Sequence, residues 1–304
     1  MNQAFQQKLR AMAAGPVLFD EPLDRYTSLR VGGKADALLF PQSVYELEIL
    51  VRLFKEGGYP FLVAGNWTNL LVRDGGYRGA IIAMKDFRRV TWGEGDKNYV
   101  MVDAQAGVSL SELVRLTAEQ ALAGMAFCAG IPGSVGGAVM MNAGAYGLEI
   151  KDVLHKVTLM DDQGNMTDCL RNDLSFEYRR LDLPERTIVI SAVFCLERGD
   201  RQTILDRIDE ILDKRRQKHP LDYPSAGSIF KNPAGHPAGL LIEAAGLKGL
   251  QVGGAKVSEK HGNFIINTGH AKAADILALM EQVQKEVFAQ TGIALEPEVR
   301  IIGD

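Results

Sequence analysis

The sequence predicts an α+β fold with more than one domain. Segments with helical periodicity and short apolar runs typical of buried strands alternate irregularly, without the regular strand–helix alternation of a doubly wound parallel sheet. At 304 residues, the chain exceeds what one hydrophobic core usually organises, so two or three domains are expected. Hydrophobic residues make up 46% and charged residues 24%, a globular balance that excludes disorder, collagen and coiled coil.

The first predicted helix covers residues 44–56. Ser43 and Glu46 have the spacing of a capping box, apolar residues follow at helical intervals, and Gly57 begins the glycine pair that ends the helix. A continuous apolar run at 61–64 then predicts a short buried strand.

The next elements extend to the middle of the chain. Ser109 and Glu112 repeat the capping-box spacing, and the two glycines after Asp74 interrupt the chain at a plausible domain boundary. In order, we expect a turn over 65–69, an apolar run over 70–72, a break over 74–76, a strand over 100–106 and a helix over 109–122.

The second half begins with a hairpin, because Asp162 to Asn165 is a turn sequence between two strand-like runs. Apolar residues from Ile204 onward share one helix face, and Pro220 closes that helix. In order, we expect strands over 156–160, 166–170 and 187–196, a helix from about 204, a strand over 264–266, a helix over 273–290 and a final strand over 298–302.

The charge and the motifs exclude several functions. The net charge of −4 gives no basic field for nucleic acid or an anionic membrane, and the sequence lacks the common nucleotide, zinc and serine-hydrolase motifs (GxGxxG after a strand, GxxxxGK[ST], HExxH, GxSxG). The five histidines are scattered, so no metal site is expected. Three cysteines without CxxC spacing and an N-terminus without an export signal predict a cytoplasmic protein.

A long uncharged segment extends from Gln120 to Leu148. It could cross a bilayer by length, but its seven glycines would weaken a helix and expose backbone polar groups to lipid. We therefore expect no membrane span. Such a segment indicates instead that main-chain N–H groups come close to a ligand.

Two glycine-bearing turns are the best candidates for ligand contact. Turns over 65–69 and 130–137 could present N–H groups to a pyrophosphate without a lysine. The first turn is equally compatible with a connecting loop, whereas the glycine density of the second favours a ligand. The cluster Ser225 to Pro233 is by itself a polar loop, and the basic tract Lys214 to His219 suits a helix C-terminus, although one of its lysines could reach a phosphate.

Taken together, these stretches resemble the UDP-N-acetylenolpyruvoylglucosamine reductases, flavoproteins of peptidoglycan precursor synthesis. The resemblance spans residues 27–303 in the family's order. It rests on TSLRVGG (27–33), NLLVRDGG (69–76), AGIPGSVGGAVMMNAGAYG (129–147), Tyr178-Arg179, AGSIFKNP (226–233) and LEPEVRIIG (295–303).

The resemblance implies a two-part FAD-binding domain of the vanillyl-alcohol-oxidase (PCMH) type, followed by a smaller α+β substrate domain. The corresponding ranges are 1–75 and 76–200 for the FAD-binding subdomains and 201–304 for the substrate domain. FAD is implied as a non-covalent cofactor and NADPH as co-substrate. The short connection between Arg179 and the helix from 204 resembles the subclass that lacks a substrate-capping tyrosine loop.

The resemblance also assigns site residues. It implies Arg179, Ser228 and Glu298 as catalytic residues, and Tyr178, Lys218 and Asn232 as substrate contacts. Trp67 departs from the family's small residue in the first turn. The implied FAD contacts are Gly65, Asn66, Thr68, Asn69, Gly130, Pro132, Gly133, Ser134, Gly136, Gly137, Asn142 and Gly144.

The implied reaction is reduction of an enolpyruvyl ether on a UDP-sugar, with no nucleic acid and no obligate protein partner indicated. Arg179 and Glu298 would stabilise the developing enolate, and Ser228 would donate a proton to C2. One alternative is an oxidase of the same FAD fold, but residues 64–69 contain no histidine for covalent attachment of flavin. The other is a non-catalytic flavin or nucleotide-sugar binding protein, which would not need the three catalytic residues.

Overall fold

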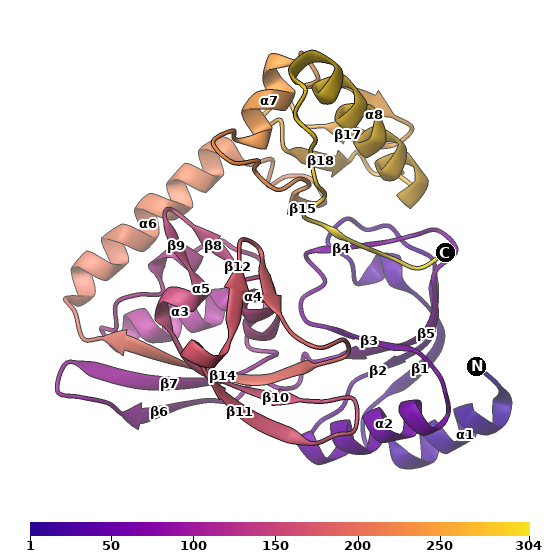
Figure 1. Cartoon of the computed structure of the whole chain (residues 1–304), viewed down its shortest axis with the longest axis vertical. Helices are drawn as coiled ribbons and strands as arrows, with labels where there is room; N and C mark the ends of the chain where they lie inside the picture. The colour runs from indigo at the N-terminus through magenta and orange to yellow at the C-terminus, as the bar shows by residue number, and fades with distance from the viewer. The chain divides into compact units, whose positions relative to one another are not determined.

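The computed structural model describes residues 1–304, which divide into two compact units (Figure 1). Unit 1 comprises residues 1–19, 37–66 and 79–213, and unit 2 comprises residues 20–36, 67–78 and 214–304. Helix α6 (Arg201–Lys218) carries the chain from unit 1 into unit 2. The predicted boundaries after residues 75 and 200 stay a prediction, to which the structure adds that two N-terminal stretches group with the C-terminal residues.

The first sheet, four-stranded, has the order β1 (Val17–Pro22), β2 (Lys34–Leu39), β5 (Tyr77–Ala83), β3 (Phe61–Ala64). Strands β3 and β5 pair in parallel, with Phe61 opposite Ala80. The predicted helix is α2 (Val44–Glu56), which lies beside the N-terminal α1 (Gln3–Met12) in Figure 1. Neither α1 nor β5 was predicted from the sequence.

Helix α2 begins at the predicted cap, but its capping box is incomplete. The Oγ of Ser43 accepts a hydrogen bond from the N–H of Glu46 at 3.1 Å, as expected. The buried carboxylate of Glu46 accepts instead from the N–H groups of Gln42, Ala14 and Gly15 at 2.8–2.9 Å. Glu46 therefore holds the segment after α1 against α2 rather than closing its own helix.

The second sheet of unit 1 is antiparallel and contains the strands that the sequence predicts most clearly. Its order is β11 (Met166–Leu170), β10 (Leu154–Met160), β14 (Ile188–Glu197), β7 (Tyr99–Gln105), β6 (Val90–Glu94). The predicted hairpin is confirmed, since β10 and β11 pair with Met160 opposite Met166.

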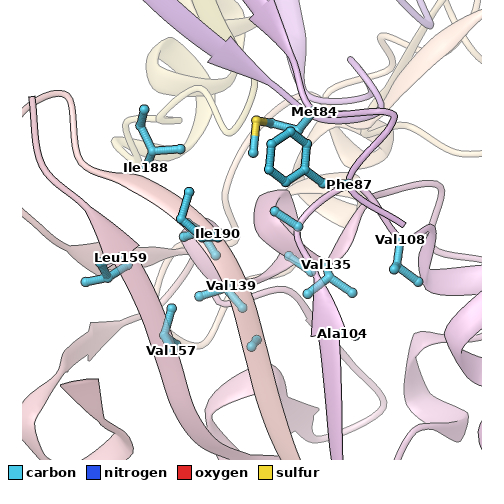
Figure 2. Packing of buried hydrophobic residues seen from close by; sticks show 14 of the residues in the cluster. Met84, Phe87, Ala104, Val108, Val135, Val139, Val157, Leu159, Ile188 and Ile190 are labelled. Carbon is cyan, nitrogen blue, oxygen red and sulfur yellow. The ribbon is translucent and has the colours of Figure 1, made fainter. Parts of the chain in front are cut away.

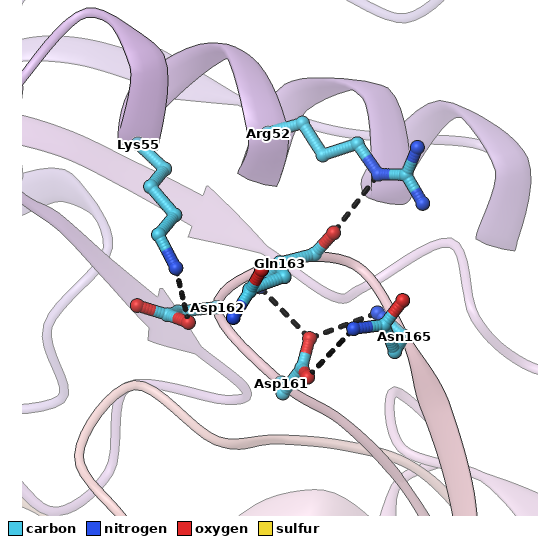
Figure 3. A network of polar contacts seen from close by, with 6 residues as sticks. All are labelled: Arg52, Lys55, Asp161, Asp162, Gln163 and Asn165. Atoms are coloured by element: carbon cyan, nitrogen blue, oxygen red, sulfur yellow. Dashed lines mark hydrogen bonds and ion pairs between the residues drawn. The ribbon is translucent and has the colours of Figure 1, made fainter.

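The turn of this hairpin is held by its own residues and by α2 (Figure 3). The carboxylate of Asp161 accepts from the N–H groups of Gln163 and Asn165, both at 2.8 Å. Hydrogen bonds from Asn165 lower the pKa of Asp161. On α2, Lys55 pairs with Asp162 at 2.8 Å, and Arg52 donates to the carbonyl of Gln163.

The core of unit 1 is one cluster of apolar side chains that lies between the antiparallel sheet and its helices and extends to α1, α2, β3 and β5. Helix α4 (Val135–Met140) lies within the uncharged segment and packs on β14 and β7. Figure 2 shows Val135 and Val139 of this helix close to Ile190 and Ala104 of the sheet. Helix α3 (Leu110–Glu119) ends three residues before the predicted terminus, and α5 (Ile150–Val153) follows the segment.

Unit 2 has its own core, formed by a four-stranded sheet and two helices. The sheet order is β15 (Ser225–Ser228), β18 (Phe264–Asn267), β17 (Ala255–Val257), β16 (Gln251–Val252). Helices α7 (Ala238–Ala244) and α8 (Ala273–Thr291) pack with it, and β4 (Leu70–Val72) pairs in parallel with β19 (Arg300–Ile302). The predicted break at Asp74 caps α8, since its carboxylate accepts from the N–H groups of Ala273 and Ala274, both at 2.9 Å.

The uncharged segment contains no long helix. Residues 120–148 include a short 3-10 turn (Ala126–Cys128), the six-residue α4 and part of the two-residue ladder of β8 (Gly144–Ala145) and β9 (Leu148–Glu149). No helix of the structure combines the length and the apolar character needed to cross a membrane.

Candidate active site

The two predicted glycine turns meet in unit 1. The side-chain amide of Asn66 donates to the carbonyl of Gly133 at 3.0 Å. A Cβ on Gly65 would lie 2.0 Å from the Oγ of Ser134, so only glycine fits there without displacing that hydroxyl. Ser134 is buried and is the N-cap of α4, where its Oγ faces the N–H of Gly137 at 3.4 Å. The structure thus joins segments that are almost 70 residues apart.

The two glycines of α4 differ in their surroundings, since one packs closely against a neighbouring segment and the other is exposed. The N–H of Gly136 donates to the carbonyl of Ala106 at 2.9 Å, and a Cβ on Gly136 would lie 2.8 Å from the Cβ of Ala106. Gly136 therefore brings the helix close to the chain after β7. Gly130, Pro132 and Gly137 are exposed, as is Asn66 of the first turn.

These exposed main-chain groups and the uncharged surroundings fit the pyrophosphate and the planar ring system of FAD. The N–H groups of Val135 and Gly136 at the start of α4 already donate to the carbonyls of Val108 and Ala106. The backbone available to an anion is therefore the exposed part of the two turns, at Asn66 and Gly130. Contact of the twelve predicted residues with FAD stays a prediction.

Arg179 lies in unit 1 at the tip of a hairpin formed by β12 (Ser175–Glu177) and β13 (Arg180–Asp182). Its backbone is in the left-handed region, with φ 59°, which is uncommon for a residue with a side chain. The guanidinium donates to the carbonyl of Gly144 at 3.0 Å and lies 4.8 Å from the ring of Tyr178, which is exposed. The hairpin therefore presents two predicted site residues together.

Asn142 is fully buried beneath this hairpin. Its side-chain amide donates to the carboxylate of Glu149 and to the carbonyl of Glu177, both at 3.0 Å, and its Oδ1 accepts from the N–H of Lys151. The side chain of Asn142 thus has protein partners on both its nitrogen and its oxygen. No role was predicted for Glu149 from the sequence, although it is the first charged residue after the uncharged segment.

In unit 2, the later residues of the first turn lie against the C-terminal strand. The amide of Asn69 donates to the carbonyl of Glu298 at 3.0 Å, and β19 follows two residues later. Trp67, the departure from the family pattern, is buried with φ 57°, and its ring centroid lies 5.5 Å from that of Tyr26, with the two rings tilted by 36°. The bulky residue is thus accommodated by packing within unit 2.

The other two predicted catalytic residues are also joined in unit 2. The N–H of Glu298 donates to the carbonyl of Ile229, the residue after Ser228, at 2.7 Å. Ser228 ends β15, where it is partly exposed and lies opposite Phe264 of β18. Asn232 follows on an exposed loop, and its Oδ1 accepts from the N–H of Ala238.

Lys218 is exposed in the last turn of α6, beside a cluster of aromatic rings. The ring of His219 lies 4.9 Å from Phe264 and 5.6 Å from His261. Burial, followed by the positive charge of Arg215, lowers the pKa of His219 to about 4. A neutral His219 therefore packs the end of α6 against the strand that pairs with Ser228.

Unit 2 also contains a cavity of about 320 Å³ that sequence reasoning missed. Thr27, Ser28, Arg30 and residues 221–224 line it, including Tyr223. Ser28 connects this cavity to the first turn, since its N–H donates to the carbonyl of Trp67. The motif TSLRVGG could have indicated this cavity, because three of its residues line it.

Comparison with known proteins identifies the family. Residues 35–170 match a model of an FAD binding domain, and residues 219–302 match the C-terminal domain of UDP-N-acetylenolpyruvoylglucosamine reductase. The reductase of Syntrophus aciditrophicus (strain SB) is 50% identical over 98% of this chain and 96% of its own length. The chain belongs to the UDP-N-acetylenolpyruvoylglucosamine reductase family. A second family member, from Caldanaerobacter subterraneus subsp. tengcongensis, is 45% identical over the whole of both chains.

A solved family structure agrees with the fold. The UDP-N-acetylenolpyruvylglucosamine reductase (MurB) of Thermus caldophilus matches with a TM-score of 0.79 and 36% identity, over 95% of this chain and 99% of that chain. The predicted family, the FAD-binding α+β fold with its C-terminal reductase domain, and the use of FAD in an oxidoreductase of peptidoglycan precursor synthesis are therefore confirmed.

Proposed function

We propose that this chain uses NADPH to reduce UDP-N-acetyl-3-O-(1-carboxyvinyl)-glucosamine to UDP-N-acetylmuramate, with Arg179, Ser228 and Glu298 as its catalytic residues. The observation that carries the proposal is the junction in unit 2, where the N–H of Glu298 donates to the residue after Ser228 at 2.7 Å. This main-chain hydrogen bond brings together the segments that carry a proton donor and a carboxyl group. Family membership supports the substrate class.

The two glycine turns would hold FAD, which after reduction by NADPH would be the source of the hydride that C3 of the enolpyruvyl group receives. Negative charge then develops on C2 and on the adjoining carboxylate of the substrate. Arg179 stabilises this charge as a permanent cation, and Glu298 does so in its protonated form or through its hydrogen bonding. Ser228 donates the proton to C2, which completes the reduction.

The remaining predicted residues hold the UDP-sugar. Lys218 and Tyr178 are both exposed, and a lysine at the end of α6 supplies positive charge for the pyrophosphate. Only a few residues separate β13 from β14 and β14 from α6, which supports assignment to the subclass without a tyrosine loop. The use of NADPH as reductant supports a cytoplasmic reaction.

The experiment measures two half-reactions separately. The first is reduction of the flavin by NADPH, and the second is its reoxidation by the enolpyruvyl substrate. We expect purified protein to carry FAD and to oxidise more than one equivalent of NADPH per flavin only when the enolpyruvyl sugar nucleotide is present. In Ser228→Ala, NADPH should bleach the flavin at nearly the wild-type rate, whereas reoxidation by the substrate should slow by about two to four orders of magnitude, the usual effect of losing a general acid. Stopped-flow absorbance measures each step.

Ser225→Ala is the matched control, because Ser225 begins the same strand and should leave both rates nearly unchanged. Equal slowing of both half-reactions in Ser228→Ala, or an unchanged second one, would remove Ser228 from the mechanism.

A further inference from the structure

We propose that Asn142 and Glu149 are positioning residues that hold Arg179 in place for the second half-reaction. The inference rests on the proposed role of Arg179. Its starting point is that the hairpin bearing Arg179 is attached to the rest of unit 1 at two defined points.

The first point fixes the hairpin backbone. The amide of Asn142 donates at 3.0 Å to the carbonyl of Glu177, the last residue of β12. Only Tyr178 separates Glu177 from Arg179, so this bond lies directly beside the turn. The left-handed φ of Arg179 is a strained backbone conformation, and this bond keeps the turn from changing to a less strained one.

The second point fixes the guanidinium. Arg179 donates to the carbonyl of Gly144 at 3.0 Å, and Gly144 lies opposite Glu149 in the β8–β9 ladder. A Cβ on Gly144 would lie 2.7 Å from the carbonyl oxygen of Leu148, so the ladder at this position is tight. The acceptor of the guanidinium is therefore set by the same short ladder that contains Glu149.

The carboxylate of Glu149 orients the asparagine. It accepts from the amide of Asn142 at 3.0 Å, while the N–H of Lys151 donates to the Oδ1 of Asn142 at 3.2 Å. These two bonds determine which end of the buried amide faces the hairpin. The ammonium of Lys151 lies 2.5 Å from the carboxylate and balances its charge. Glu149 thus acts on Arg179 through Asn142.

The main test is whether Glu149 acts through Arg179. We expect Glu149→Ala to retain bound FAD and near-normal bleaching by NADPH, but to slow reoxidation by the enolpyruvyl substrate about 10- to 100-fold, as for the loss of a charged hydrogen-bond partner. In an Arg179→Ala background, the same substitution should cause no further slowing. Merely structural destabilisation would add in both backgrounds.

Two further variants sharpen the result. Asn142→Asp places two carboxylates against each other and should slow reoxidation at least as much, whereas adding Glu149→Gln restores a donor–acceptor pair and should recover part of the rate. The control Arg180→Ala removes an exposed ion pair with Asp182 in the same hairpin and should change reoxidation by less than about twofold.

Several outcomes would overturn the proposal. These are loss of FAD in Glu149→Ala, equal slowing of both half-reactions, reoxidation within twofold of wild type, or a further loss in the Arg179→Ala background. A wild-type protein that does not reduce the enolpyruvyl substrate would instead contradict the proposed function itself.

Discussion

The contact between the two glycine turns can be tested by making a clash and then relieving it. Gly65→Ala would place a methyl group 2.0 Å from the Oγ of Ser134 and 3.2 Å from its Cβ. The hydroxyl would have to rotate away and give up its 3.4 Å contact with the N–H of Gly137. The backbone φ of Gly65 is not positive, so the methyl group itself adds no backbone strain.

The expected magnitudes follow from these contacts. Losing the helix cap costs about 1 kcal/mol, and leaving a hydroxyl of the 1% exposed Ser134 without a partner costs about 1–3 kcal/mol. Gly65→Ala should therefore lower the free energy of unfolding by about 2–4 kcal/mol. Ser134→Ala alone should cost about 1 kcal/mol, and in the double variant no hydroxyl remains to be displaced. We expect the double variant to lose about 2–4 kcal/mol less than the sum of the single losses, because the cap is then lost only once and no hydroxyl is stranded.

Urea unfolding followed by circular dichroism gives each free energy, and visible absorbance gives the bound FAD. FAD should fall further in Gly65→Ala than in the double variant, where the clash is relieved. Gly93→Ala is the control, since its Cβ would meet only atoms at 3.5 Å or more and should change stability by less than about 0.5 kcal/mol. If the loss of unfolding free energy in the double variant equals the sum of the two single losses, the proposed contact is refuted.

Two further predictions concern unit 2. His219 is neutral in the folded protein because its pKa is lowered to about 4, so the stability it contributes is present above about pH 6.5 and is lost as pH falls toward 4. Allowing for solvent around the partly buried ring, that contribution is about 1–2 kcal/mol, and His219→Phe should flatten the urea-unfolding profile over this range. Asp74→Ala should lower the unfolding free energy by about 1–2 kcal/mol through loss of the α8 cap, whereas Glu281→Ala on the exposed face of α8 should change it by less than about 0.5 kcal/mol.

Local signals predicted the elements well because their causes lie within a few residues. The caps at Ser43 and Ser109 each accept from the N–H three residues later, and the β10–β11 turn closes on Asp161. Both partners of such a contact lie within a few residues of each other, so their spacing in the sequence is enough to predict the contact. Helix α1 and strand β5 were missed although they carry such local signals, apolar residues at helical spacing (Phe5, Leu9, Met12) and the apolar run over residues 80–83.

Long-range partners could not be predicted in the same way. The carboxylate of Glu46 binds N–H groups about 30 residues earlier, and Asp74 caps a helix almost 200 residues later. No pattern in the neighbourhood of either residue identifies its partner, because the partner is chosen by tertiary packing. For the same reason the grouping of residues 20–36 and 67–78 with the C-terminal residues was not anticipated.

Arg179 shows how a site residue can be expected from a motif while its geometry cannot. Its φ of 59° costs about 1–2 kcal/mol for a residue with a Cβ, and glycine or asparagine at this turn would avoid most of that cost. Its bond to the carbonyl of Gly144, 35 residues away, depends on the β8–β9 ladder and on the buried amide of Asn142. A positive φ alone does not distinguish Arg179, since Arg186 has a φ of 64°. What distinguishes Arg179 is that its guanidinium is also held by the carbonyl of Gly144. Under the role proposed for Arg179, this bond would keep its positive charge in a fixed place.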